Sequence, residues 1–423
     1  MADSLRLIQT AIRMEWPVRL MKPLLGKFVP FLPEFRAAPY DHYERLRARS
    51  PVYYSRSLQG WVLSRYRDIV GVLGDPRFSV NRQQANVFRR FDLFGALEPG
   101  FSAAVVNTLL MIDPPQHTRI RKLVSKAFTP RRVEQLRGRI EQIVSELIDR
   151  LDPRGFDVVR DIGQPLPTIV IAEMLGVPAS DHEAFKQWSN ALTALLDPFQ
   201  AEDGMRPAEQ AFLALREYLH RIFAERRQQP TDDLITGLVQ AEEEGRHLDE
   251  TELLALVMLL LAAGNETTTN LIANGMLALT RDRAAQQRWR EDPSLTRTAV
   301  EELLRFDSPV QLTDRVATED CEIDGHRIRK GELVGMILGS ANHDPAQFPN
   351  PGRLDLDRSD NAHLSFGHGV HFCLGAQLAR LEAHVAFPAL LRRFSDFGPP
   401  PARVDWKRSV VLRGLTSLPL SPG

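Results

Sequence analysis

The sequence predicts a mostly α-helical fold with a small β portion, that is, an α+β arrangement. From about residue 131 onward, apolar residues recur three and four positions apart, as in "RRVEQLRGRIEQIVSELIDRL" and "AFLALREYLHRIFAERR". This period is typical of an amphipathic helix with one buried face. Strand-like alternation is confined to "PVYYSRSLQGWVLSRY" and "CEIDGHRIRKGELVGMILGSAN", so we expect only a small sheet.

The composition predicts one large globular domain that covers residues 1–423. Hydrophobic residues make up 43% of the chain, and no Gly/Ser-rich linker, charge block or repeat divides it. Because 53 basic residues oppose 54 acidic ones, the overall charge favours neither a nucleic-acid nor a general membrane partner. The two cysteines cannot form a disulfide framework and no secretory leader opens the chain, so we expect a cytoplasmic protein.

Residues 1–35 form a predicted N-terminal extension with a short amphipathic helix. Leu5, Ile8 and Ile12 recur at helical spacing before Pro17 ends the pattern. Such a helix can pack on the domain or rest on a membrane surface. We favour packing, because the segment is short and its acidic residues dilute its positive charge.

Residues 78–107 are predicted to form a long apolar loop with a helical turn, because the pattern there loses its period. Loops of this length are often functional, although each phenylalanine in it can equally well cover the core. These phenylalanines are Phe88, Phe91, Phe94 and Phe101.

The segment "DETELLALVMLLLAAGNETTTNLIANGMLAL" predicts a buried helix with a polar centre. Asp249 and Glu252 have the spacing of a capping box, and the run that follows is apolar up to Ala263. This run is well short of the ~20 residues that span a bilayer, so we expect no transmembrane helix. Glu266 and Thr267 follow it, and a buried carboxylate needs hydrogen bonds, neutralisation or water. The glycine, asparagine and threonines around Glu266 predict a local widening of the helix.

Two further helices carry charged residues on one face. Glu302 and Arg305 are three positions apart, and each therefore lies on the same face as the other. Alone, Glu302 and Arg305 resemble an ordinary surface ion pair. His117 and Arg121 are four positions apart and could together hold an anion. The other basic residues near Arg121 predict either a docking patch for an acidic protein or a solvated face: Arg119, Lys122, Lys126, Arg131 and Arg132.

Cys373 lies in the stretch "FGHGVHFCLGAQLAR", among glycines and histidines and directly before a predicted helix. A thiolate there is stabilised by unpaired backbone N–H groups and the helix dipole. Three interpretations compete on this fragment: a zinc ligand, a nucleophile with His371 as its base, or an inert buried thiol. A zinc site would lack further ligands, since Cys321 falls in a predicted strand and no paired Cys or His motif completes the set.

The ten residues "FGHGVHFCLG" resemble the haem-thiolate signature of the cytochrome P450 superfamily, and other stretches resemble its landmarks in the same order. "AGNETT" resembles the oxygen-activating helix, and Glu302-x-x-Arg305 resembles the structural ion pair. "NPGRLDLDR" resembles the meander before the cysteine loop, and "RGLTSLPL" the closing strand pair, so the resemblance covers residues 40–423. Leu354 departs from the pattern, because the meander commonly has an aromatic residue there, and this concerns local packing only.

The resemblance implies the family's fold, in which haem b lies between the cysteine loop and a long central helix. Cys373 matches the axial thiolate ligand, which favours O–O cleavage. Glu266 and Thr267 match the acid and alcohol that deliver protons to bound dioxygen, while the pair at residues 302 and 305 becomes a buried scaffold. The positions that match haem contacts are His117, Arg121, Arg315 and His371, at the propionates, and Ala263, Phe366 and Gly375.

The implied function is a haem-thiolate monooxygenase of the bacterial soluble type, which inserts one atom of O2 into a C–H or C=C bond. The sequence contains no flavin or iron–sulfur domain, so we expect electrons from a ferredoxin and its NAD(P)H-dependent reductase. The alternatives are a peroxide-driven peroxygenase and a non-enzymatic haem-binding sensor. We expect a lipophilic substrate, such as a fatty acid, terpenoid, steroid or macrolide, in a pocket lined by Phe88, Phe91, Ala262, Val310, Leu312, Leu415 and Thr416.

Overall fold

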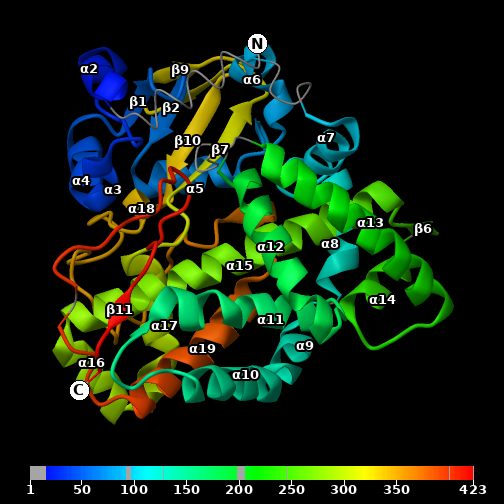
Figure 1. Ribbon diagram of the computed structural model, residues 1–423. Helices are drawn as coiled ribbons and strands as arrows, with labels where there is room; N and C mark the ends of the chain where they lie inside the picture. The colour runs from blue at the N-terminus through cyan, green and yellow to red at the C-terminus, as the bar shows by residue number, and fades with distance from the viewer. Residues whose placement is uncertain are drawn as a thin grey trace.

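The computed structural model describes residues 16–91, 97–126, 128–197, 205–243, 245–399 and 401–422, and the fold below is that of these residues. It is mostly helical with a small sheet portion, which confirms the predicted class (Figure 1). The main sheet and the N-terminal helices lie at one end of the molecule, and the larger helical part lies at the other (Figure 1). The predicted helix around Leu5, Ile8 and Ile12 falls outside the described residues.

The helices of the larger part carry the predicted apolar faces and pack them inward. Their bounds, with those of the N-terminal helices, are α2 Trp16–Leu25, α3 Pro33–Ala37, α4 Pro39–Arg49, α5 Tyr66–Gly74, α6 Asn86–Phe91, α7 Pro99–Val106, α8 Gln116–Ser125, α9 Pro130–Gln135, α10 Arg137–Asp149, α11 Pro165–Met174, α12 His182–Leu192, α13 Arg206–Gln228, α14 Leu234–Val239, α15 Glu250–Arg281, α16 Arg283–Glu291, α17 Thr296–Phe306, α18 Leu338–Ala341 and α19 Ala376–Arg393.

The main sheet has the strand order β1-β2-β10-β7-β3 and combines the two strand regions that the sequence predicts. β2 and β10 are parallel, with Val334 opposite Trp61, and the other neighbours are antiparallel. Its strands are β1 Val52–Ser55, β2 Gly60–Leu63, β3 Phe78–Ser79, β7 Leu312–Ala317 and β10 Leu333–Ile337. Three two-stranded pairs complete the β structure: β4 Phe156–Asp157 with β11 Pro419–Leu420, β5 Glu242–Glu243 with β6 Arg246–His247, and β8 Cys321–Ile323 with β9 His326–Ile328.

Two local predictions are wrong. Residues 78–107 contain β3, α6 and α7 rather than one loop with a single turn. The helix predicted from residue 131 is divided at Leu136, which keeps helical dihedral angles (φ −77°, ψ −13°), so the break is a tightened turn. Pro17 lies in the first turn of α2, where proline is tolerated because its missing N–H would have no helical partner; the run that it was predicted to end lies outside the described residues.

The long helix α15 joins two hydrophobic cores and has its polar residues between them. Its first half packs with α12 and α13, and its second half packs with α10 and α19. Each fully buried leucine in these halves contributes about 1.5–3 kcal/mol, so the helix is firmly held at both ends. The predicted capping box is confirmed: the Asp249 carboxylate accepts from the Glu252 amide at 2.8 Å, and the Glu252 carboxylate accepts from the Asp249 amide at 3.1 Å.

The helix α15 is α-helical from Glu250 to Arg281, so the predicted widening at its polar centre is wrong. Packing on both sides of the centre fixes the regular geometry in spite of poor helix formers. The helix is long and apolar enough to cross a membrane by length and composition, but 72% of that stretch is buried inside the protein. It is therefore a core helix of the fold.

A fully buried ion pair connects α17 to the segment that leads to Cys373. The guanidinium of Arg305 donates two hydrogen bonds of 2.8 Å to the carboxylate of Glu302, and both side chains have 0% exposure. Arg305 also donates to the carbonyl of Asn342, while Glu302 accepts from the Asp355 amide and from Arg358. Since every part of the pair is hydrogen-bonded, it fixes residues 342–358 against α17.

Candidate functional site

Cys373 lies in a loop whose backbone is tightly constrained. Its own amide donates to the Phe366 carbonyl at 2.9 Å, which closes the loop, and its thiol sulfur accepts from the amides of Gly375 and Ala376 at the start of α19. Gly369 has φ +72°, and a Cβ there would lie 2.7 Å from the Leu73 carbonyl oxygen, so only glycine fits. The fold therefore presents the sulfur at the N-terminal end of a helix.

Burial raises the pKa of the Cys373 thiol, while the two amides and the guanidinium groups of Arg121 and Arg380 act in the opposite direction. Cys373 nevertheless has solvent-accessible surface. A sulfur that is accessible yet closely surrounded by protein can receive a ligand from one direction. Cys321 lies in β8, so it cannot serve as a second metal ligand beside Cys373. The described residues contain no cluster of three His, Cys, Asp or Glu side chains that could hold a metal ion, which argues against zinc.

Four basic side chains from two elements and the cysteine loop gather beside Cys373. His117 and Arg121 come from α8, Arg315 comes from β7, and His371 comes from the loop; the two imidazole rings are 4.1 Å apart. The charges of Arg121 and Arg315 act on both histidines. Arg121 also donates to the Phe372 carbonyl at 2.5 Å.

This cluster needs an anion. Burial is the main cause that lowers the pKa of His117 to about 4 and that of His371 to about 3, and neighbouring positive charge adds to it. Burial likewise lowers the pKa of Arg315 to about 10. Both ring nitrogens of His117 are buried without a hydrogen-bond partner, at 1% exposure of the residue. A buried donor without a partner is costly, so carboxylates from a bound molecule fit this place.

The central helix α15 carries a stripe of partly exposed residues, called the accessible stripe below. Five residues with one-turn spacing keep partial exposure within an otherwise buried stretch: Leu259, Leu260, Ala263, Gly264 and Thr267. The hydroxyl of Thr267 donates to the Ala263 carbonyl at 2.8 Å, which keeps both residues on this stripe. Ala262 lies one position away and is fully buried against α12 and α13, because each helical step turns by about 100°.

Packing within the protein does not require glycine at positions 264 and 375. A Cβ at either position would meet no protein atom within 4 Å, and Gly375 has φ −84°, which any residue adopts. Gly264 costs about 1 kcal/mol relative to alanine inside a helix. A flat molecule that lies close to both backbones accounts for both glycines, and this agrees with a haem between α15 and the cysteine loop.

Glu266 is held by an ion pair that sequence reasoning missed. Lys407, from the C-terminal segment, places its ammonium 2.6 Å from the Glu266 carboxylate, with side-chain exposures of 13% and 11%. The Asn270 amide donates to the same carboxylate at 3.4 Å. The neighbouring polar residues have other partners, since Asn265 donates to Ser189 and Thr269 donates to the Gly163 carbonyl. Glu266 is therefore an oriented and almost buried carboxylate next to the accessible stripe.

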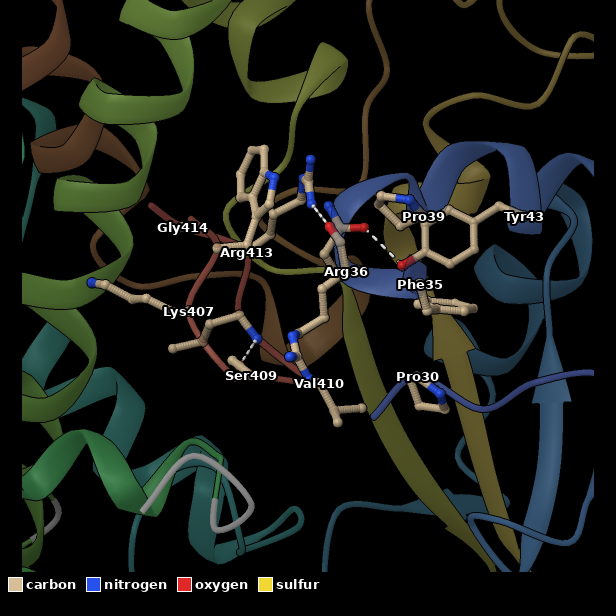
Figure 2. A pocket seen from close by; sticks show the side chains of 13 residues that line it. Pro30, Phe35, Arg36, Pro39, Tyr43, Lys407, Ser409, Val410, Arg413 and Gly414 are labelled. Carbon is tan, nitrogen blue, oxygen red and sulfur yellow. Dashed lines mark hydrogen bonds between the residues drawn. The ribbon is translucent and has the colours of Figure 1, made fainter. Parts of the chain in front are cut away.

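A small pocket lies beside Lys407, between the α3–α4 region and the C-terminal segment (Figure 2). Its cavity volume is about 30 Å³, room for about two water molecules and too small for a lipophilic substrate. Arg36, Ser409 and Arg413 line it, and Figure 2 shows Lys407 pointing away from these side chains. Lys407 thus connects a water-sized space to Glu266.

The predicted substrate-lining residues are dispersed. Val310 forms a β-bridge with Leu412, so these two segments meet. Leu312 packs into the N-terminal core, and Leu415 is fully buried in the core around α10 and α19. Thr416 is exposed and donates to the Asp405 carbonyl at 3.0 Å, on the outside of the fold. Phe88 is half-buried on α6, and the side chain of Phe91 lies outside the described residues.

Comparison with known proteins identifies relatives over most of the chain. Residues 105–408 match the family model described as Cytochrome P450. Polyketide biosynthesis cytochrome P450 PksS of Bacillus subtilis (strain 168) is 40% identical over 404 residues, which is 93% of this chain and 98% of that protein. Cytochrome P450 monooxygenase PikC of Streptomyces venezuelae is 41% identical over 397 residues, 92% of each chain.

A solved structure has the same fold. P450BioI, in complex with an acyl carrier protein ligated to hexadec-9Z-enoic acid, matches with a TM-score of 0.85 and 36% identity. The match covers 92% of this chain and 99% of that chain. The similarity therefore includes the sheet end, the central helix and the helical end together.

Proposed function

The chain belongs to the cytochrome P450 family, and from that premise we propose which of its residues hold the cofactor, deliver protons and receive electrons. The protein is a bacterial haem-thiolate monooxygenase that hydroxylates or epoxidises small lipophilic molecules with O2. The accessible stripe on the buried helix α15, which ends at Thr267 beside the oriented carboxylate of Glu266, is the observation that carries the assignment of roles.

The proposed haem site is built from Cys373 and the basic cluster. Cys373 would hold the haem iron through its thiolate, and the bound haem-thiolate would supply the dioxygen chemistry. The unpartnered nitrogens of His117, together with Arg121, Arg315 and His371, bind the two propionates. Ala263 and Gly375 would lie against the haem, and Phe366, whose ring centre is 4.6 Å from the Arg380 guanidinium, supports the loop.

Glu266 and Thr267 are the proposed proton-delivery residues. Thr267 holds a hydroxyl on the accessible stripe, while Glu266 lies beside it with its carboxylate held by Lys407. Lys407 is a positioning residue in this proposal: it keeps the carboxylate at one place and connects it to the small pocket. Water in that pocket provides the supply of protons from solvent.

The test of this role is a pair of threonine variants. Thr267→Ala should lower the amount of product formed per NAD(P)H oxidised and raise peroxide release, because the hydroxyl that guides protons is lost. Thr268→Ala is the matched control, since Thr268 is a buried neighbour outside the accessible stripe. If Thr267→Ala formed as much product per NAD(P)H oxidised as the wild type, the proposal would be contradicted. Efficient turnover with peroxide alone would instead favour the peroxygenase alternative. A haem sensor would show no turnover, either with peroxide or with NAD(P)H, reductase and ferredoxin.

The proposed electron donor is a ferredoxin, which docks at the basic face around α8 and α9. Val370 and Phe372 are exposed apolar residues beside Cys373, and the exposed Lys122 and Arg131 lie on the adjoining helices. Arg119 contributes less than the sequence predicts, because its guanidinium is paired with the Glu252 carboxylate. This face adjoins the cysteine loop, because Arg121 of α8 donates to the Phe372 carbonyl.

Charge reversal tests the docking face. Lys122→Glu combined with Arg131→Glu should slow reduction by ferredoxin, most strongly at low ionic strength. Arg327→Glu is the control, because β9 lies at the opposite end of the molecule from α9 (Figure 1). Equal rates for the two charge-reversed proteins would contradict docking at this face.

The proposed substrate is a polyketide-type or fatty-acyl compound. PksS acts in polyketide biosynthesis by its name, and the P450BioI structure contains a carrier protein that bears a fatty acid. The stripe residues Leu259 and Leu260 give this chain an apolar surface suited to such a guest. Titration of free and carrier-bound polyketide and fatty-acyl compounds should shift the haem absorption band. A panel of terpenoids and steroids that shifted the band more strongly would contradict this class. We also propose that the protein acts in the cytoplasm as one domain.

A further inference from the structure

The helix α2 exposes an apolar face at the outer edge of the sheet end (Figure 1). Among the described residues, Trp16, Leu20 and Leu24 are the three most exposed large apolar side chains, at 60%, 72% and 67%. They are four positions apart, so they form one stripe along the helix. Met21 borders the stripe and is 41% exposed. Exposed apolar side chains that adjoin each other in this way indicate an interaction surface.

The opposite side of α2 is anchored in the protein. Val18 is 3% exposed and Leu25 packs beside it, in the same core as Phe28 and Phe35. The helix is therefore fixed by its inner side, and its outer apolar side is presented in a defined direction.

Basic side chains border the apolar stripe. Arg19 and Lys22 both bridge to Glu34, at 3.3 and 3.6 Å, and remain at least half exposed. Arg56, which is exposed, donates to the Leu24 carbonyl at 3.4 Å and so lies next to the end of the stripe. Lys27 lies two positions after the end of α2 and is exposed as well, with its ammonium donating to the Ser50 hydroxyl at 2.7 Å. The Glu34 carboxylate thus pairs with two of these four cations.

A tryptophan and leucines on one face with lysine and arginine at its border are typical of helices that lie in the surface of a bilayer. A two-fold contact with a second copy would bring the same basic residues together and repel. We propose that α2 binds this protein to an anionic lipid surface, with Trp16, Leu20 and Leu24 inserted among the acyl chains. Lys22, Lys27 and Arg56 then face the lipid phosphates and carboxylates. Such binding places the enzyme where lipophilic molecules collect.

The experiment is flotation of the haem-loaded full chain with vesicles of phosphatidylcholine, alone or mixed with phosphatidylserine. Wild-type protein should float with the mixed vesicles and bind the neutral ones several-fold less. Leu20→Glu should reduce binding to mixed vesicles by about tenfold or more, because an inserted leucine becomes a charge. Lys22→Gln should reduce it by about fivefold and leave binding to neutral vesicles unchanged.

Leu213→Glu is the matched control, since Leu213 is an exposed leucine on α13, far from α2 in Figure 1. It should bind vesicles as the wild type does. Thermal midpoints of both leucine variants should equal that of the wild type, because each side chain is exposed. Failure of the wild type to float, whether because residues 1–15 cover the stripe or because a second copy does, overturns the proposal. Equal binding of the Leu20→Glu and Leu213→Glu proteins overturns it as well, and neither result depends on turnover.

Discussion

Replacing Lys407 with methionine removes the ammonium that holds the Glu266 carboxylate and keeps most of the apolar stem. At the observed 2.6 Å, two unit charges attract by about 6 kcal/mol with an effective dielectric constant of about 20. Desolvation of the two ions offsets much of this attraction. Since Asn270 still donates to the carboxylate in the variant, we expect a loss of about 2–3 kcal/mol in the free energy of unfolding.

Lys407→Met should also impair catalysis, by more than its loss of stability accounts for. Without Lys407 the Glu266 carboxylate is free to leave its place and loses its connection to the small pocket, so product formed per NAD(P)H should fall several-fold. Lys407→Arg keeps the charge and should restore part of the coupling. A double-mutant cycle that combines Lys407→Met with Glu266→Gln should give an interaction energy of about 1–3 kcal/mol between the two side chains. Denaturant unfolding and simultaneous measurement of NAD(P)H, product and peroxide provide these values.

The control for charge removal is Arg137→Met, which breaks the exposed pair between Arg137 and Glu134. That variant should change stability by no more than about 0.5 kcal/mol and leave coupling unchanged. If Lys407→Met behaved like Arg137→Met in both measurements, the assignment of Lys407 as the positioning partner of Glu266 would be wrong.

Three further predictions follow from other parts of the structure. Gly369→Ala should destabilise even the haem-free protein by about 1–3 kcal/mol, because φ is +72° and the Leu73 carbonyl is close, whereas Gly375→Ala should leave haem-free stability unchanged and weaken only haem retention. Glu302→Gln should cost about 3–5 kcal/mol in denaturant unfolding, since it leaves a buried guanidinium without its anion; a cost below about 1 kcal/mol would contradict the scaffold role. Burial raises the pKa of Glu382 to about 8 from 4.5, so the native state binds more protons than the unfolded state in that interval and stability should fall as pH rises through it. Glu382→Gln should flatten this decline in unfolding measured across the interval, and an unchanged slope would refute the argument.

The fold class and the cysteine loop were predictable because both depend on local patterns. Helical periodicity, the capping box at Asp249 and the residues around Cys373 are continuous in the chain. The regular geometry of α15 was not predictable from its poor helix formers, since packing at both ends of the helix overrides local propensity.

The partners within the site depend on contacts between distant segments. Lys407 is 141 positions from Glu266, and no local pattern indicates that they meet. The contact between His117 and His371 joins α8 to the cysteine loop, and only the family resemblance suggested it. The prediction grouped Ala262 with Ala263 on one lining face of the helix, but one helical step separates Ala262 from the accessible stripe. The spacing of four positions back from Thr267 to Ala263, and again to Leu259, would have identified that stripe.

The most direct measurement of the central claim is the absorption spectrum of the reduced, carbon monoxide-bound protein, with both cysteines varied. Wild type and Cys321→Ser should show the red-shifted band of a thiolate-bound haem, because Cys321 lies in β8 away from the site. Cys373→His should fold, as judged by circular dichroism, and show the band of a histidine-bound haem. A histidine-type spectrum from folded wild-type protein, or a thiolate-type spectrum from Cys373→His, would contradict Cys373 as the haem ligand.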